Sequence, residues 1–221
     1  MTALPQMDPL HRNRTRKAAA MRLVLILELL ERFGYYSLQG IIVLFLSEQP
    51  GFDVRSATLL WGAFTAIALA APAIGGWVGD RVLGAKRSIL LGCIILLAGY
   101  AGMALPVPMH DLIYLDFALI AVGDGLFKPN AANMIRHIHA DDDAALDVAF
   151  TIYYMGISVG STLALLLTPL MREHLGAHMA FGVSMAGMGA GTAFMLLRWR
   201  TLAGVGAAAD FRPLGGRVVL G

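Results

Sequence analysis

Long apolar stretches alternate with short polar ones along the whole chain. Six apolar runs are each near or above the about 20 residues that an α-helix needs to cross a bilayer. They cover residues 23–46, 59–78, 88–105, 112–134, 148–170 and 179–197. The polar segments between them are short, and several contain the turn-forming residues proline and glycine. The pattern predicts an all-α membrane protein with six transmembrane helices, in which consecutive helices are antiparallel neighbours.

Composition supports this fold class and divides the chain. Hydrophobic residues make up 57% of the 221 residues and charged residues only 14%, whereas about a quarter of an average soluble domain is charged. We divide the chain into an N-terminal tail (1–20), a six-helix transmembrane domain (21–200) and a C-terminal tail (201–221). The C-terminal segment is rich in glycine and alanine, so we expect it to form a loose tail.

Lysine and arginine are distributed unevenly between the two sides of the predicted membrane domain. If the N-terminus is inside, the outer loops hold only Arg55 and Arg172, and the other basic residues outside the spans all lie inside. Retained positive charge marks cytoplasmic segments. Both termini are therefore predicted to be cytoplasmic, in a multi-pass protein of the cell (inner) membrane. The basic residues form short clusters beside the membrane, so the net charge of +2 does not indicate nucleic-acid binding.

The first span carries a stripe of polar side chains. Their spacing places them on one face of a helix over three turns, and they are Glu28, Glu31, Arg32, Tyr35, Tyr36 and Gln39. A central charge costs roughly 2.5 to 3.5 kcal/mol on membrane-insertion scales, so ionisable residues inside a span are functional candidates. The stripe is the strongest functional signal of the sequence.

The fourth span contains a cation, Lys128, that balances the net negative charge of the first span. Glu28, Glu31, Arg32 and Lys128 carry no net charge together, which predicts that they share one cavity. A carboxylate there could change protonation according to the position of its cationic neighbours. Asp124 precedes Lys128 by four residues on the same helical face. It either holds the lysine when substrate is absent or forms a simple neutralising pair.

A glycine-rich segment, residues 75–87, ends the second span and leads into the third. Its glycines allow close helix packing. Four charged residues at this cytoplasmic rim are candidates for gating, with Asp80 able to pair with the basic residues beside it: Asp80, Arg81, Lys86 and Arg87.

Four segments resemble the motifs of one family. They are residues 28–36 (EXXER-type, reading ELLERFGYY), 75–87, 125–130 and 150–161. Over about residues 22–200 the chain resembles the proton-dependent oligopeptide transporters (POT/PTR) of the major facilitator superfamily, in particular the N-terminal six-helix half of the bacterial dipeptide and tripeptide permeases. The resemblance implies proton-coupled symport of di- and tripeptides, driven by a proton gradient without a cofactor.

The resemblance also implies roles for individual residues. It assigns proton coupling to Glu28, Glu31, Arg32 and Lys128. It assigns substrate binding to Tyr35, Tyr36, Gln39, Lys128, Asn130 and Ser158. Three positions depart from the family pattern: Gln39 replaces an arginine, Leu69 a tyrosine and Ser158 an asparagine. These departures affect the peptide-binding positions more than the proton-coupling ones.

The superfamily fold joins two six-helix halves and binds substrate between them, whereas this chain matches only the first half. We therefore expect that a second half-transporter or a homodimer partner supplies the other wall of the cavity. The alternative is a non-transporting six-helix fragment or assembly module.

A third, remote reading is an intramembrane hydrolase. Gly156, Ser158 and Gly160 fit the G-x-S-x-G pattern, but that motif needs a strand-to-helix turn, and these residues lie within an apolar span. We expect no enzyme activity, and Gly156 and Gly160 are predicted to form a helix-packing face instead. His137 and His139 lie beside an acidic loop, which is predicted to be solvated, so no metal site is expected.

Overall fold

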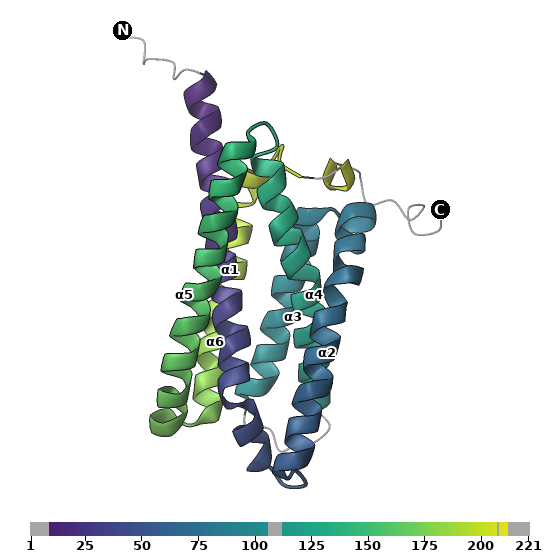
Figure 1. Ribbon diagram of the computed structural model, residues 1–221, viewed down its shortest axis with the longest axis vertical. Coiled ribbons are helices and arrows are strands. Elements are labelled where there is room, and N and C mark those ends of the chain that lie inside the picture. The colour runs from purple at the N-terminus through teal and green to yellow at the C-terminus, as the bar shows by residue number, and fades with distance from the viewer. Residues whose placement is uncertain (1–8, 106–111, 207, 212–221) are drawn as a thin grey trace.

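The computed structural model describes residues 9–105, 112–206 and 208–211. Six long helices form the molecule (Figure 1): α1 (Pro9–Ser47), α2 (Val54–Val78), α3 (Ala85–Ala104), α4 (Leu112–Ile138), α5 (Asp143–Leu175) and α6 (Ala177–Leu197). Each covers one of the six apolar runs, except that the run 88–105 extends one residue beyond α3. The predicted all-α, six-helix architecture is confirmed.

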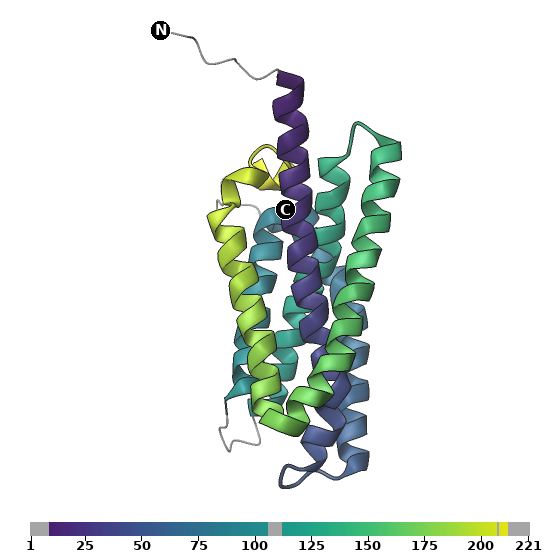
Figure 2. The same cartoon turned by 90° about the vertical axis from the view of Figure 1, so that its left-hand side faces the viewer.

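The helices form an elongated bundle in which α1 is central. It packs against α5 and α6 on one side and against α2 and α4 on the other, while α3 packs against α4 and α6. Figure 1 shows α1, α5 and α6 as one group beside the group of α2, α3 and α4, and Figure 2 shows the same bundle from its side. The helices α1 and α4 therefore meet between the two groups.

Five of the six helices are long and apolar enough to cross a membrane by length and composition, in a search of the described residues. The exception is α4, which carries Asp116, Asp124, Lys128 and Arg136. Asp116 and Asp124 are buried, and α4 packs between α2 and α3. Neighbouring helices thus shield the polar groups that lower the hydropathy of α4.

Small residues allow α4 and α5 to approach their neighbours closely. A Cβ added to Gly75 of α2 would lie 1.9 Å from the carbonyl oxygen of Gly125 of α4, and one on Gly160 of α5 would lie 2.8 Å from the carbonyl oxygen of Leu29. Gly156 has open space around it. The predicted packing face of α5 is therefore formed by Gly160 and not by Gly156.

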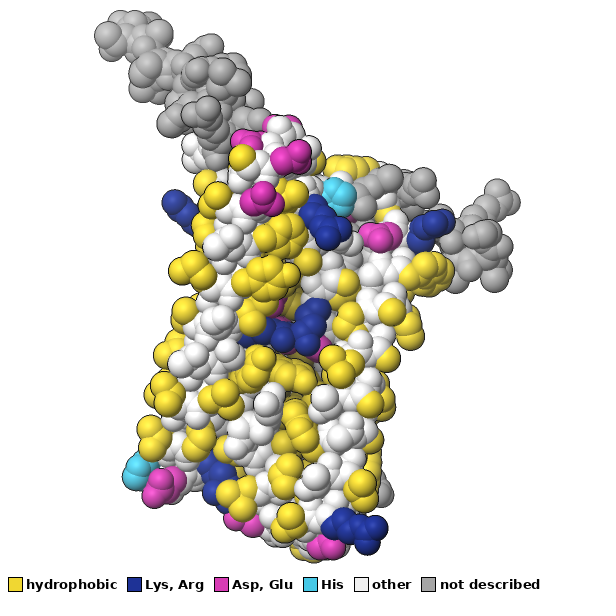
Figure 3. All heavy atoms as spheres, in the orientation of Figure 1, with side chains coloured by type: hydrophobic (Ala, Val, Ile, Leu, Met, Phe, Trp, Pro, Cys, Tyr) yellow, Lys and Arg dark blue, Asp and Glu magenta, His cyan; other side chains and the backbone are white. Residues whose placement is uncertain are grey.

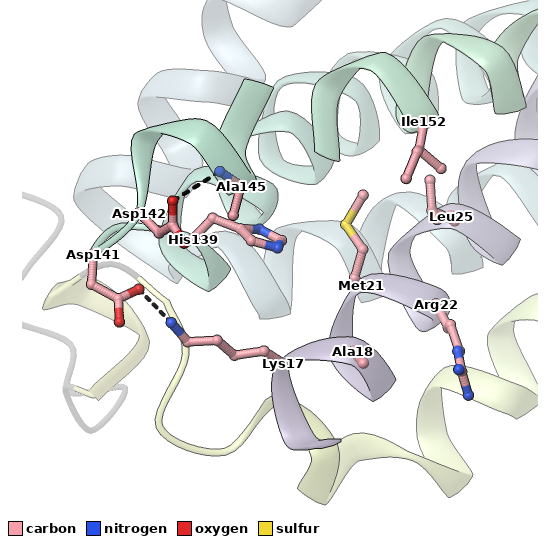
Figure 4. Close-up of a pocket in the computed structure, with 10 residues that line it drawn as sticks. All are labelled: Lys17, Ala18, Met21, Arg22, Leu25, His139, Asp141, Asp142, Ala145 and Ile152. Atoms are coloured by element: carbon pink, nitrogen blue, oxygen red, sulfur yellow. Dashed lines mark hydrogen bonds and ion pairs between the residues drawn. The ribbon is translucent and has the colours of Figure 1, made fainter. Parts of the chain in front are cut away.

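The first helix begins well before the membrane domain predicted from the sequence. It has 39 residues, about 58 Å at 1.5 Å per residue, so residues 9–20, expected to be a tail, continue the helix. Lys17 forms an ion pair with Asp141 in the α4–α5 connection. A cavity of about 610 Å³ opens beside this pair, and Figure 4 shows Met21, Leu25 and Ile152 along its apolar side.

The segment after α6 differs from the loose tail that the composition predicts. It contains two short 3₁₀ helices, η2 (Trp199–Leu202) and η3 (Ala208–Phe211). Asp210 accepts hydrogen bonds from the backbone N–H groups of Ala85 and Lys86, both at 3.0 Å. It thereby caps the N-terminus of α3, whose own N-cap residue, Gly84, provides no side-chain cap. The hydropathy pattern carries no signal for such a contact between distant segments.

Candidate functional site

Arg32 is the centre of a buried cluster of charges between α1 and α4. Its Nη2 contacts Asp124 Oδ1 at 2.8 Å and also bonds Glu31 Oε2, while its Nε lies 3.4 Å from Glu28 Oε1. The three carboxylates are at most 1% exposed and Arg32 is 5% exposed. The structure therefore brings together the charges of the first-span stripe, as predicted.

Lys128 joins the same cluster through Asp124. Its Nζ lies 2.8 Å from Asp124 Oδ2, so the two oxygens of Asp124 each face one cation. The Lys128 ammonium also lies 4.7 Å from the centre of the Tyr35 ring, and the Arg32 guanidinium 5.3 Å from it. Asp124 is thus more than an intrahelical partner of Lys128, since it connects α4 to α1. The Lys128 side chain is 29% exposed and is the accessible member of the cluster.

Tyr153 of α5 completes the cluster. Its hydroxyl donates a hydrogen bond of 2.8 Å to Glu28 Oε2, and the side chain is buried. In the sequence, Tyr153 lies within the matched segment 150–161, and no role is predicted for it. The available signal was the tyrosine pair Tyr153 and Tyr154 in a span that packs beside the charged one.

Asp124 adds a third carboxylate to the four charges that the sequence predicted to share one cavity. With Asp124 there are three carboxylates and two cations, so the fully ionised cluster carries a net charge of −1. Glu31 and Asp124 both contact Arg32 Nη2, which places two like charges side by side away from water. Binding one proton would make the cluster neutral.

Several predicted substrate-binding positions are more accessible than the closed cluster. The exposed faces of α2 and α5 are called the open wall. Tyr35 and Tyr36 are half-buried, and Gln39 and Ser158 are exposed. Leu69 of α2 is 77% exposed and Tyr154 of α5 is 62% exposed. In Figure 3 a hollow with cationic and acidic side chains lies midway along a largely hydrophobic face, while most other charges lie at the two ends.

Asn130, also a predicted substrate-binding residue, lies between α4 and α2. It is fully buried, and its side-chain amide donates to the carbonyl oxygens of Gly75 (2.9 Å) and Leu126 (2.8 Å). The amide of Asn130 therefore joins α4 to α2, and it does not share the open wall with the other predicted substrate-binding residues. Its position follows from Gly79, where a Cβ would lie 1.6 Å from Asn130 Oδ1.

Two of the four candidate gating residues, Asp80 and Arg81, lie in the π-helical turn η1 (Gly79–Leu83) between α2 and α3. The other two, Lys86 and Arg87, lie at the start of α3. Asp80 accepts a hydrogen bond of 3.1 Å from Asn133 of α4, whereas the sequence suggested a basic partner. Lys86 is buried, with its Nζ 3.4 Å from the carbonyl oxygen of Leu202 and 4.9 Å from the centre of the Phe211 ring. Arg81 is exposed and Arg87 half-buried. The turn is thus held by α4 and by the segment after α6.

The G-x-S-x-G pattern around Ser158 lies on a helix in the structure. Ser158 lies inside the continuous helix α5, with its hydroxyl donating to the carbonyl oxygen of Tyr154 at 3.0 Å, so the strand-to-helix turn of a nucleophile elbow is absent at this position. Among the described residues no group of three or more His, Cys, Asp or Glu side chains could hold a metal ion.

Six packed helices, five of them long and apolar enough to cross a membrane among the described residues, and a cluster of charges buried between α1 and α4 define a helical membrane protein. Comparison with known families agrees: the chain belongs to the POT family, whose model matches residues 86–205.

Similar proteins share this architecture. The chain is 44% identical over 204 residues to dipeptide and tripeptide permease A of Proteus mirabilis (strain HI4320). The aligned region covers 91% of this chain and 41% of the permease. Identity to the protein of the same name from Chromobacterium violaceum is 40% over 200 residues, 90% of this chain and 40% of that one. The chain thus spans about two fifths of the length of these relatives.

Solved structures of peptide transporters have the same fold. The crystal structure of tetrameric PepTSo2 matches with a TM-score of 0.84 and 42% identity, over 90% of this chain and 44% of that one. A peptide transporter POT in complex with sulfate matches with a TM-score of 0.81 and 29% identity, over 86% of this chain and 40% of that one. The six helices therefore have the arrangement of one half of a major facilitator superfamily transporter.

Proposed function

We propose that this chain forms one six-helix wall of a proton-coupled symporter for di- and tripeptides in the cell inner membrane, with both termini in the cytoplasm. The observation that carries the proposal is the buried cluster of three carboxylates and two cations. Family membership and the permeases to which the chain is similar support peptides as the substrate class.

The cluster offers a physical route from peptide binding to proton binding. Lys128 is its accessible cation and is held by Asp124 at 2.8 Å. The fully ionised cluster has a net charge of −1, and a peptide carboxylate that binds Lys128 adds a further negative charge. Uptake of protons by the carboxylates restores neutrality, because uncompensated charge is costly in a poorly solvated site. Peptide and protons would therefore bind together.

The same proposal requires a partner for the open wall. Within the apolar windows of α2 and α5 only 17% of the residues are buried, against 50% for α1 and 44% for α3. Ser158 and Tyr154 of α5 are exposed. A second half-transporter or a second copy of the chain would cover this face and close the peptide site.

An uptake assay tests the proposal. The chain is reconstituted into vesicles either alone or together with the remaining six-helix portion of the Proteus mirabilis permease, and uptake of a labelled dipeptide is measured under an imposed inward proton gradient. We expect gradient-driven uptake from the co-reconstituted protein, and its loss in Glu31→Gln and Lys128→Ala. Glu173→Gln, at an exposed position at the end of α5, is the matched control and should retain uptake.

The alternative is a non-transporting six-helix module. It would be favoured if both preparations gave only background uptake that does not depend on the gradient, although both variants and the unmodified chain fold and insert equally well.

A further inference from the structure

Tyr100 of α3 is a buried tyrosine whose phenol end packs against α1. Tyr100 is 0% exposed, and its hydroxyl has no hydrogen-bond partner among the described residues. Buried polar groups in proteins are almost always paired, and leaving one unpaired costs about 1 to 3 kcal/mol. This hydroxyl therefore needs an explanation that packing alone does not give.

The absence of a side chain at Gly34 fixes where the phenol end of Tyr100 lies. A Cβ at Gly34 would be 2.7 Å from both Cζ and the hydroxyl oxygen of Tyr100. The hydroxyl thus contacts α1 at Gly34, three residues after Glu31. Residues three apart lie on the same face of a helix, on neighbouring turns.

Glu31 has a free position on its carboxyl group. Its Oε2 bonds Arg32, while its Oε1 is buried and has no hydrogen-bond donor among the described residues. Two buried polar atoms are therefore unpaired, one on Glu31 of α1 and one on Tyr100 of α3, whose phenol end contacts α1 three residues after Glu31.

A phenol can serve Glu31 in both protonation states. The titratable and charged groups around this carboxyl are Glu28, Arg32, Tyr35, Cys93, Tyr100, Asp124, Lys128 and Tyr153. Tyr35 is half-buried and faces the two cations. The two cations can only donate hydrogen bonds, whereas a hydroxyl donates to a carboxylate and accepts from a protonated carboxyl. Tyr153 is already bonded to Glu28. Tyr100 is the buried hydroxyl left for Glu31.

We propose that Tyr100 is a positioning residue for the coupling proton: its hydroxyl accepts a hydrogen bond from Oε1 when Glu31 binds a proton and donates one when Glu31 is ionised. The proton comes from the aqueous phase and leaves to it, and Tyr100 stays neutral throughout. The inference rests on the proton coupling in the proposed function. It adds α3 to a site otherwise formed by α1, α4 and α5.

Infrared spectroscopy of the chain in lipid nanodiscs tests this role without requiring transport. A protonated carboxyl group absorbs through its C=O stretch, and the band of Glu31 is assigned by its loss in Glu31→Gln during a pH titration. We expect Tyr100→Phe to raise the frequency of this band, because the protonated carboxyl loses its acceptor. Tyr114→Phe removes the hydroxyl of a half-exposed tyrosine of α4 and should leave the band unchanged.

Gly34→Ala supplies an independent perturbation, since its new methyl group displaces the phenol while the hydroxyl remains. It should shift the same band. A band that disappears in Glu31→Gln but is unchanged in both Tyr100→Phe and Gly34→Ala overturns the role of Tyr100 and leaves the proposed function standing. A Glu31 band that never appears overturns both. A shifted band in a protein without uptake retains Tyr100 as the partner of Glu31 and removes the transport proposal.

Discussion

The closed cluster between α1 and α4 and the open wall of α2 and α5 differ in how completely this chain builds them. In the cluster, Glu28, Glu31 and Asp124 each have a cationic partner and are at most 1% exposed. On the wall, Leu69 and Tyr154 are 77% and 62% exposed. The charged cluster is enclosed by the helices of this chain, whereas the wall is exposed. In the proposed function the cluster binds protons and a second surface covers the wall.

Removing Arg32 should have the largest effect, because it breaks the closed region. Arg32→Gln leaves three buried carboxylates on one side of Lys128, and breaking a buried ion pair by removing one partner costs about 3 to 5 kcal/mol. The midpoint of unfolding in detergent should fall accordingly. Arg172→Gln, which removes a partner of Glu48 at the outer end of the bundle, should cost less than about 1 kcal/mol. Equal losses would show that Arg32 is not the centre of the cluster.

Tyr153 and Tyr154 are adjacent in sequence but belong to different regions, which makes them a direct test. Tyr153→Phe removes a hydrogen bond to a buried carboxylate, worth about 1.5 to 3 kcal/mol. Tyr154→Phe alters an exposed hydroxyl and should change unfolding by less than about 0.5 kcal/mol. The measurement is again the unfolding midpoint. If the two variants behaved alike, Tyr153 would belong to the wall and not to the cluster.

The two faces of α2 allow the same comparison within one helix. Gly75→Ala places a methyl group 1.9 Å from the carbonyl oxygen of Gly125, so α2 and α4 must separate, at about 1 to 3 kcal/mol. Gly62 faces open space, and Gly62→Ala should be neutral or stabilise the helix by up to about 1 kcal/mol. Thermal unfolding of both variants measures the difference, and a destabilised Gly62→Ala would mean that this face is already covered in solution.

The sequence predicts those features that are determined within a single helix. Apolar runs indicate six spans, and a spacing of three and four residues places Glu28, Glu31 and Arg32 on one face. Contacts between helices depend on crossing angle and register, which periodicity does not encode. For that reason the bridging role of Asp124, the bond from Tyr153 and the rotation of Asn130 toward α2 were visible only in the structure.

The same limit applies at the ends of the chain. Hydropathy reports the length that is apolar enough for a bilayer, and it does not report how far a helix continues in water. Residues 9–20 extend α1, and Asp210 caps α3 from a position 125 residues later in the chain. Neither feature leaves a periodic signal. The cap joins segments that are distant in sequence, and the extended part of α1 contacts a distant segment through the pair of Lys17 with Asp141.

The ion pair of Lys17 with Asp141 should have the smallest effect, since it lies at the solvated end of the bundle, outside both regions. The hydrogen bond from Lys17 lowers the pKa of Asp141 below its ordinary value of 3.8. Because the folded pKa is depressed, the contribution of the pair to stability is present above pH 3.8 and is lost as the pH falls through the folded pKa. Asp141→Asn should therefore lower the unfolding midpoint slightly at pH 7, with a difference that vanishes in acid and at high salt. Asp143→Asn, beside it at the start of α5, controls for the change in net charge, and an equal loss in that variant would assign the effect to the charge of the loop instead of to the pair with Lys17.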